Sequence, residues 1–343
     1  MEPAIKLAAD LECPLLVLCS GWSSAAEVAA LAESSDVELI AIDVTDLPTG
    51  LLPRFRTSEL LEGTKFAPTT DISLKRNLGI LFAHMAGWRR IVFLDDDITV
   101  PEPVDLRVAA GLTDTYAGVG LAITGHPDNS VVCHAYRRAG GLQDVFIGGG
   151  ALAVGRESMW SFFPAIYNED WFFLLDSDGL RPTAVTGRVT QKPNDPFSSA
   201  RARTEELGDC LAEGLFWLLD DGKSINDADA TYWCESLRRR ADFITEVLDM
   251  VSSQITDRYQ RSKMLNSVLA ARGRCLSISP ELCEDYVHAW KADRNRWQRH
   301  LTQFQLIRRR GRQSHGPGEV LALLGLTPMA EHLPRQVPIA VGV

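Results

Sequence analysis

The sequence predicts an α/β protein in which residues 1–197 form a mostly parallel β-sheet covered by helices and residues 198–343 form an all-helical C-terminal region. Two observations support this prediction. Up to about Phe197, short apolar runs alternate with amphipathic segments, the order expected of a parallel sheet with helices packed on its faces. From Ser198 to about Arg312, apolar residues recur with helical spacing and little interruption.

The first part begins with a strand–helix–strand–helix–strand unit. Two apolar runs, P-L-L-V-L-C and V-E-L-I-A-I, predict the first two strands, and I-V-F-L before three aspartates predicts the third. Asp71 or Ser73 can cap the second helix, and Gly87 fits its end. The strands are expected at residues 14–19, 37–42 and 91–94, and the helices at residues 25–33 and 74–86.

The rest of the chain supplies three more strands and several long helices. Strands are expected at residues 118–123, 131–134 and 151–154. Helices are expected at residues 169–175, 202–219, 228–272 (unbroken or broken) and 280–307. The basic run Arg308–Arg310 with Arg312 is interpreted as the solvated end of the last helix.

Composition limits the function classes. Hydrophobic residues make up 45% and charged residues 23% of the chain, which is ordinary for a globular protein. The net charge of -10 disfavours a nucleic-acid-binding protein, because neutralising phosphates requires a surplus of Lys and Arg. The seven cysteines include no C-x-x-C pair, which indicates neither a zinc site nor a disulfide framework. No apolar run is long enough for a signal peptide or a transmembrane segment, so we expect a cytoplasmic protein.

Two polar motifs are expected to meet at one edge of the sheet. Lys75-Arg76-Asn77 fall in the first turn of the second helix, and Asp95-Asp96-Asp97 follow the third strand. In a right-handed strand–helix–strand unit, the helix starts at the carboxyl edge where the next strand ends. Open α/β sheets bind ligands in the crevice at this edge, so both motifs are candidates for ligand contacts.

The three consecutive aspartates predict a metal site. Adjacent carboxylates repel one another unless a cation joins them, and hard oxygen ligands suit Mg²⁺ or Mn²⁺. The alternative is an acidic surface turn. The metal interpretation is favoured because the triplet ends a strongly apolar strand that must lie centrally in the sheet.

The segment S-L-K-R-N-L-G-I-L-F-A-H-M-A-G-W-R-R-I-V-F-L-D-D-D-I-T-V, residues 73–100, resembles the core of GT-A glycosyltransferases, particularly family 2-like enzymes. The resemblance implies a Rossmann-like GT-A domain that binds and uses a nucleotide sugar. It implies metal contacts by Asp95 and Asp97, with Asp95 also facing the nucleotide ribose and Asp96 facing the donor sugar. The other residues implied to lie at the nucleotide sugar are Ser20, Asp43, Lys75, Arg76 and Asn77.

A glycine-bearing segment extends the resemblance. The run F-I-G-G-G-A-L-A-V-G, residues 146–155, resembles the segment that lines the donor-sugar pocket of these enzymes, which implies roles for Gly148, Gly149 and Gly150. Glycines let backbone amides approach a ligand closely. An ordinary tight turn is the alternative. The run lacks the G-x-G-x-x-G fingerprint, which argues against a dinucleotide-dependent oxidoreductase.

The run Tyr167–Trp171 resembles the Glu-Asp motif of inverting family members, whose aspartate takes the proton from the acceptor hydroxyl. By this likeness Asp170 is the candidate general base, Glu169 is its catalytic neighbour and Trp171 suits stacking on a carbohydrate. The alternative is structural: Asn168 caps a helix whose first turn carries two acids, which the helix dipole favours.

The sequence therefore predicts a metal-dependent glycosyltransferase, with hexosyl transfer from a UDP- or GDP-sugar to an unidentified acceptor hydroxyl. An inverting course with Asp170 as base is favoured over a retaining one. A sugar-phosphate nucleotidyltransferase is an alternative, although the first loop lacks the basic residues typical of that class. A non-catalytic nucleotide-binding helical scaffold is another. The C-terminal helices are expected to lie on the acceptor side or to form a homodimer.

Overall fold

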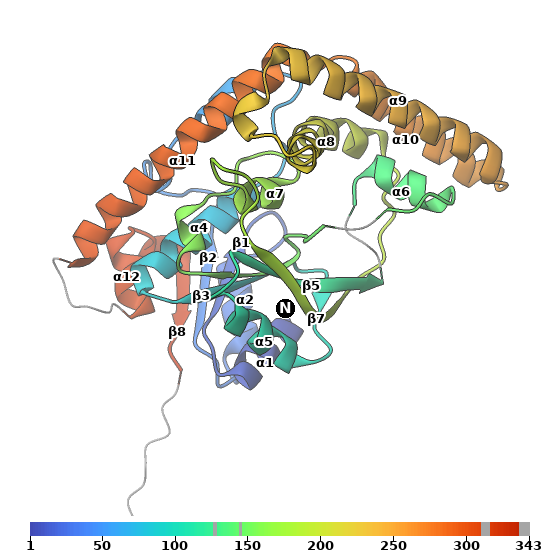
Figure 1. Cartoon of the computed structure of the whole chain (residues 1–343). Coiled ribbons are helices and arrows are strands. Elements are labelled where there is room, and N and C mark those ends of the chain that lie inside the picture. Colours follow the sequence, from blue (N-terminus) through green and yellow to red (C-terminus); the bar gives the residue numbers. More distant parts are fainter. Residues whose placement is uncertain (126–128, 144–145, 310–315, 336–343) are drawn as a thin grey trace, which may run out of the picture.

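The computed structural model describes residues 1–125, 129–143, 146–309 and 316–335, with side chains placed for all of these except residues 307–309. It shows a mixed α/β protein with two β-sheets and a large helical region, which confirms the predicted α/β class and helical C-terminal part (Figure 1). Of the basic run, Arg310 and Arg312 and the side chains of Arg308 and Arg309 lie outside the described residues.

The strands lie between two groups of helices (Figure 1). One group consists of α9 (Ala230–Gln254), α10 (Arg258–Cys275) and α11 (Pro280–Arg309). The helices on the opposite side are α1 (Glu2–Leu11), α2 (Ala25–Ala32) and α5 (Pro103–Leu112). Among the described residues, no helix is both long and apolar enough to span a membrane.

The smaller sheet has the strand order β1-β2-β8. Its strands are β1 (Leu15–Cys19), β2 (Leu39–Asp43) and β8 (Ala330–Leu333). β1 and β2 run parallel, with Leu15 opposite Leu39, and α2 connects them as predicted. β8 was not predicted and pairs antiparallel with β2, so the C-terminal region is not all helical and its end completes the first sheet.

The larger sheet has the strand order β3-β6-β5-β7-β4. Its strands are β3 (Arg90–Leu94), β4 (Ile98–Thr99), β5 (Gly118–Gly125), β6 (Ala151–Gly155) and β7 (Thr183–Gln191), of which β4 and β7 were not predicted. Among the strand pairs of the described residues, only β1–β2 and β5–β7 are parallel, so the prediction of a mostly parallel sheet is wrong. Two consecutive strands can be parallel neighbours only if the chain between them crosses over the sheet. The helix between β5 and β6 instead packs on α9, α10 and α8 (Ser199–Asp220).

The predicted strand at residues 131–134 is wrong, because this segment begins helix α6 (Val131–Arg138). The hydroxyl of Ser130 accepts a hydrogen bond from the Cys133 amide at 3.4 Å, and the carboxylate of Glu205 accepts one from the Val131 amide at 2.9 Å. These contacts satisfy two N–H groups at the helix start. Tertiary contact with Glu205 thus overrides the β-propensity of two consecutive valines.

The helical region begins at Ser198, which caps α8 (Ser199–Asp220), at the expected boundary. The expected helix at residues 228–272 is broken into α9 and α10. Asp229 accepts a hydrogen bond from the Tyr232 amide at 2.8 Å, and Asp257 accepts one from the Gln260 amide at 2.7 Å. Each aspartate thereby caps a new helix.

One hydrophobic core spans both parts of the chain. The ring of Trp290 on α11 lies 5.6 Å from that of Phe172, and the indole of Trp297 donates to the carbonyl of Met159 at 3.1 Å. The buried carboxylate of Asp293 accepts hydrogen bonds from the amides of Arg56 (2.8 Å) and Thr57 (2.9 Å), at the start of α3 (Arg56–Leu61). The helical region therefore packs tightly against the α/β part.

Candidate active site

A cavity of about 410 Å³ lies where the start of α4 (Ile72–Ala86), the turn after β3, the start of α7 (Glu169–Leu174) and one face of α8 meet. These segments are far apart in the sequence. The cavity-lining residues that were proposed from the sequence are Arg76, Asp95, Gly148, Gly149, Glu169, Asp170 and Trp171. The fold thus brings Asp95, two residues of the glycine segment and the Glu-Asp pair to one space, whereas Asp96, Asp97 and Gly150 are not among the described residues that line it.

Arg76 lies at the centre of this arrangement. Its guanidinium donates to the carboxylate of Asp95 at 3.1 Å and to that of Glu169, and only 6% of its surface is exposed. Burial alone would lower the pKa of Arg76, but the charges of Glu169 and Asp95 outweigh burial and raise it. Arg76 is therefore a permanent cation that joins the turn after β3 to the start of α7.

The Glu-Asp pair is buried at the start of α7. Both residues are 7% exposed. One oxygen of Asp170 accepts a hydrogen bond from the Gly149 amide, and the other accepts one from the Trp171 amide at 2.9 Å. Burial raises the pKa of Asp170, and it raises that of Glu169 to about 8 despite the opposing charge of Arg76. Of the two, Glu169 is the one that pairs directly with Arg76.

The turn Asp95-Asp96-Asp97 is held between two strands. The Asp95 amide donates to the carbonyl of Gly150 at 3.0 Å, and the side-chain amide of Gln191, on β7, donates to the carboxylate of Asp97 at 2.9 Å. Asp96 is exposed. The second contact depends on β7, so the sequence motif alone does not show how Asp97 is oriented.

Asp95 and Asp97 fit a hard divalent cation. Both carboxylates are partly exposed, and Mg²⁺ is usually held by one or two carboxylates, with water and substrate phosphates as its other ligands. Gln191 fixes the orientation of Asp97, which leaves that side chain better placed as a ligand than Asp95, already paired with Arg76. The donor set is therefore consistent with Mg²⁺ or Mn²⁺ at this turn.

Glu206, Cys210 and Cys275 form a separate group of potential ligands, whose ligand atoms lie within 4.8 Å of one another. The guanidinium of Arg240 holds both oxygens of Glu206, at 2.9 and 3.2 Å. With its one carboxylate taken by Arg240, this group offers a metal ion only two thiols, whereas the turn after β3 keeps the carboxylate of Asp97, which is bonded by the neutral amide of Gln191. Asp95–Asp97 do not form a three-ligand group of this kind in the described part of the chain.

Four other residues proposed for the nucleotide sugar have structural partners and are not among the described residues that line the cavity. The Asn77 side chain bonds both the amide and the carbonyl of Phe163, each at 2.8 Å. Asp43 accepts a hydrogen bond from the amide of Ala25 at 2.8 Å, at the start of α2. The other two meet at one aspartate: Lys75 pairs with Asp71 at 3.4 Å, and the Ser20 hydroxyl also bonds Asp71.

The glycine segment fits closely around Arg76 and Asp95. A Cβ atom on Gly149 would lie 2.7 Å from the guanidinium carbon of Arg76, and one on Gly150 would lie 3.3 Å from a carboxylate oxygen of Asp95. Gly149 also donates its amide to Asp170. Glycine at position 149 is required by this close approach.

Trp171 and Phe146 form an aromatic wall of the cavity, and Phe216 packs against both rings. The ring centre of Trp171 lies 5.0 Å from that of Phe146 and 4.8 Å from that of Phe216. A rigid aromatic face of this kind suits the apolar face of a sugar ring. The wall combines the segment after α6 with the start of α7, and a residue near the C-terminal end of α8 supports it.

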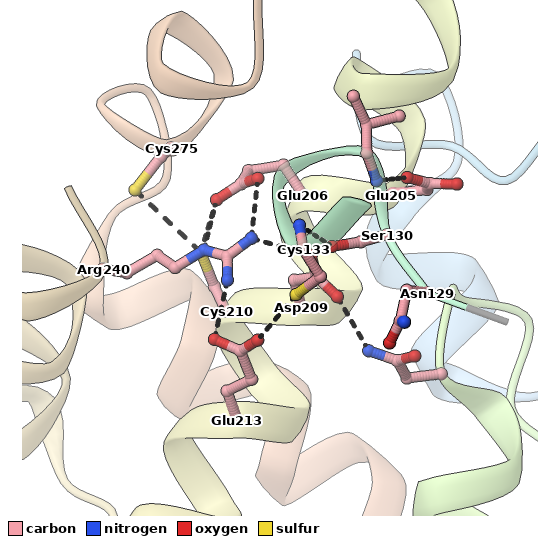
Figure 2. Close-up of polar contacts among 12 residues, drawn as sticks. Asn129, Ser130, Cys133, Glu205, Glu206, Asp209, Cys210, Glu213, Arg240 and Cys275 are labelled. Carbon is pink, nitrogen blue, oxygen red and sulfur yellow. Dashed lines mark hydrogen bonds and ion pairs between the residues drawn. The ribbon is translucent and has the colours of Figure 1, made fainter. Parts of the chain in front are cut away.

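The sequence predicts a pocket wall at Arg201–Gly208, and Arg201, Thr204, Glu205 and Leu207 do line the cavity. Sequence reasoning missed that this polar face of α8 continues to Asp209 and Glu213 (Figure 2). Glu205, Asp209 and Glu213 line the cavity from this helix, and Arg240 on α9 bonds the last two from behind, each at 2.7 Å. Their four-residue spacing places three acids on one face of a predicted helix. That spacing was a usable signal for a polar, buried face.

Comparisons with protein-family models and with curated proteins find no match for this chain.

Proposed function

We propose that this protein is a metal-dependent glycosyltransferase that moves a sugar, in the first place a hexose, from a UDP- or GDP-sugar to an acceptor hydroxyl. The observation that carries the proposal is the bridge made by Arg76, which ties Asp95 to Glu169 across one cavity. The acidic turn, a glycine segment and a buried pair of acids are the parts that such a transfer needs.

The two acids of α7 differ in what they can do. The carboxyl group of Glu169 is held by the guanidinium of Arg76, which leaves Asp170 as the base. Each oxygen of Asp170 accepts one backbone hydrogen bond, which orients the carboxylate while leaving it a lone pair on each oxygen. Burial raises the pKa of Asp170, which makes its carboxylate a stronger base than an exposed one.

The proposed reaction is a single displacement. Asp170 takes the proton of the acceptor hydroxyl, and the acceptor oxygen forms a bond to the anomeric carbon. The bond between this carbon and the diphosphate oxygen breaks on the opposite side, so the nucleoside diphosphate leaves with that electron pair and the configuration inverts. A divalent cation held by Asp97 and Asp95 would stabilise the negative charge on the departing diphosphate.

The proposal is tested by titrating the full-length protein with UDP and GDP, with and without Mn²⁺. We expect one of them to bind only with Mn²⁺, and Asp97→Ala to abolish this binding without lowering the melting temperature. Asp114→Ala, which removes an exposed acid paired with Arg90, is the matched control and should bind like the unmodified protein. Metal-independent binding, or unchanged binding by Asp97→Ala, would reject the metal site.

A transfer assay then separates the remaining alternatives. A glycosyltransferase releases nucleoside diphosphate from the nucleotide sugar, whereas a nucleotidyltransferase consumes a nucleoside triphosphate and releases pyrophosphate. A non-catalytic scaffold would bind the nucleotide and release neither product. The anomeric configuration of the product distinguishes inversion from retention.

A further inference from the structure

The cavity has an acidic wall that the proposed donor does not explain. Glu205, Asp209 and Glu213 line it from α8, and their side chains are only 7%, 4% and 15% exposed (Figure 2). A negatively charged diphosphate would be repelled by three carboxylates in a poorly solvated space. This wall therefore lies on the side of the cavity where the acceptor binds.

The acidic wall is not neutralised by the protein. Arg240 donates to Asp209 and Glu213 but also to Glu206, and Arg201 pairs with Glu205. Two arginines therefore face four carboxylates along α8. In the described part of the chain six carboxylates line the whole cavity, and the three arginines that pair with them are Arg76, Arg201 and Arg240.

Uncompensated carboxylates in a buried place favour a cation. Burial raises the pKa of both Glu205 and Glu213 to about 7, because their arginine partners offset only part of the cost of burying these charges. A ligand that brings a positive charge would remove this cost and form charge-assisted hydrogen bonds.

Gln143 is a second, independent sign of a ligand rich in hydrogen-bond donors. It lines the cavity, and its side-chain NH₂ group donates to the sulfur of Cys133 at 3.1 Å. Its side-chain oxygen is buried and has no hydrogen-bond partner among the described residues. Buried acceptors are almost always paired, so an N–H or O–H group of a ligand is the expected partner.

The acidic wall is connected to the proposed base. The side-chain amide of Asn168 donates to Asp209 at 3.0 Å, and Asn168 directly precedes the Glu169-Asp170 pair. A molecule held by Asp209 is therefore close to the start of α7. The aromatic ring of Trp171, on the same cavity wall, can contact a sugar ring or a cation.

From these contacts we infer that the acceptor carries a protonated amine, which binds against the acidic wall of Glu205, Asp209 and Glu213 while one of its hydroxyl groups faces Asp170. This inference rests on the proposed function and specifies the class of its second substrate: an amine-bearing, polyhydroxylated compound such as an amino sugar. The donor diphosphate lies at the other end of the cavity, beside the turn Asp95–Asp97.

The test compares glucosamine with glucose, which differ only by an ammonium group in place of one hydroxyl. Calorimetric titration of the full-length protein at pH 7 without donor should show that glucosamine binds about tenfold more tightly or better. Glu213→Gln and Glu205→Gln keep the size of the side chain and should each reduce this preference several-fold. Glu235→Gln, at an exposed acid on α9, is the control and should leave it unchanged. Melting temperatures verify that each variant is folded.

The outcomes separate this inference from the proposed function. Equal binding of the two sugars, no binding of either, or a preference that both cavity variants retain would overturn the inference. So would binding of Mn²⁺ alone to the acidic wall, lost in Glu213→Gln, without binding of glucosamine. A preference for glucosamine without Mn²⁺-dependent binding of UDP or GDP would instead reject the glycosyltransferase and keep the cation site.

Discussion

The guanidinium of Arg76 lies 3.1 Å from the carboxylate of Asp95, so the second turn of α4 is bonded directly to the end of β3. The same guanidinium bonds Glu169, which is 93 residues further along the chain. A single buried cation therefore holds three segments of the cavity together. Because Arg cannot lose its proton in a protein, this link persists at every physiological pH.

The first prediction concerns the base. Asp170→Asn keeps the shape of the side chain but removes the proton acceptor, so sugar transfer should fall by about a hundred- to ten-thousand-fold. Binding of nucleoside diphosphate should persist. Transfer rate and melting temperature are measured together, because a purely structural role at the helix start would cost about 1 kcal/mol of stability and leave transfer nearly intact.

Glu169→Gln is the internal control for that experiment. It removes the charge that pairs with Arg76 but leaves Asp170 in place. We expect a smaller loss of transfer than for Asp170→Asn. A collapse of transfer confined to Glu169→Gln would move the base one residue upstream.

The second prediction concerns the close approach of the glycine segment to Arg76. In Gly149→Ala, the added methyl group would meet the guanidinium and displace it from Asp95 and Glu169. Overpacking of this kind costs about 1–3 kcal/mol, and transfer should fall with it. Gly111→Ala is the control, because a Cβ atom there has no neighbour within 4 Å and should add up to about 1 kcal/mol to the stability of α5. Full transfer by Gly149→Ala would show that Arg76 does not position the site.

The third prediction is a fall in stability as the pH rises. Burial raises the pKa of Glu169 to about 8, and that of Glu205, Glu206 and Glu213 to about 7, from an ordinary value of 4.5. The folded protein therefore binds more protons than the unfolded chain between these values. Since stability falls with pH wherever the folded state holds more protons, the free energy of unfolding should decrease from pH 4.5 to about pH 8.

Urea unfolding at several pH values checks this prediction. In Glu205→Gln the free energy of unfolding should depend less on pH between pH 4.5 and about pH 8, because the variant lacks one of the groups that release a proton on unfolding. Glu235→Gln should not change the pH dependence of the free energy of unfolding in this range, because Arg238 and Arg239 lower the pKa of the exposed Glu235 carboxyl to about 2. An unfolding free energy that rises toward pH 8 would contradict the assignment of these carboxyls as buried and short of cations.

The fourth prediction concerns the dependence of the α/β part on the helical region. Trp290 is fully buried against Phe172, so Trp290→Ala should cost about 3–5 kcal/mol. Tyr259→Ala, at an exposed aromatic residue on α10, should change stability by less than about 0.5 kcal/mol. A chain truncated after Phe197 should aggregate, because it exposes the apolar surface that α11 covers. A soluble truncated chain that still binds nucleotide would show that the helices are a separate module.

The sequence by itself was enough to predict most of the local structure. Short apolar runs predicted β1, β2, β3, β5 and β6, and helical periodicity predicted α2, α4, α7, α8 and α11. The expected serine cap of α2 is confirmed at Ser24, but neither Asp71 or Ser73 at α4 nor Asn168 at α7 caps its helix through its side chain. These signals are local, since they depend on residues within one or two turns or on the two faces of one strand. The sequence also indicated which polar residues follow β3 and begin α7.

Only the tertiary structure decided how these elements are combined. The directions of the strand pairs, the helical state of residues 131–134 and the return of β8 to β2 depend on contacts far along the chain. The contacts of the site also depend on folding. Arg76 bonds Asp95 and Glu169, and Gln191 orients Asp97. Arg240 pairs with several acids of α8 at once, so these carboxylates outnumber their arginine partners. Charge balance in a buried cavity is a sum over residues that only folding brings together, so no local pattern can reveal it.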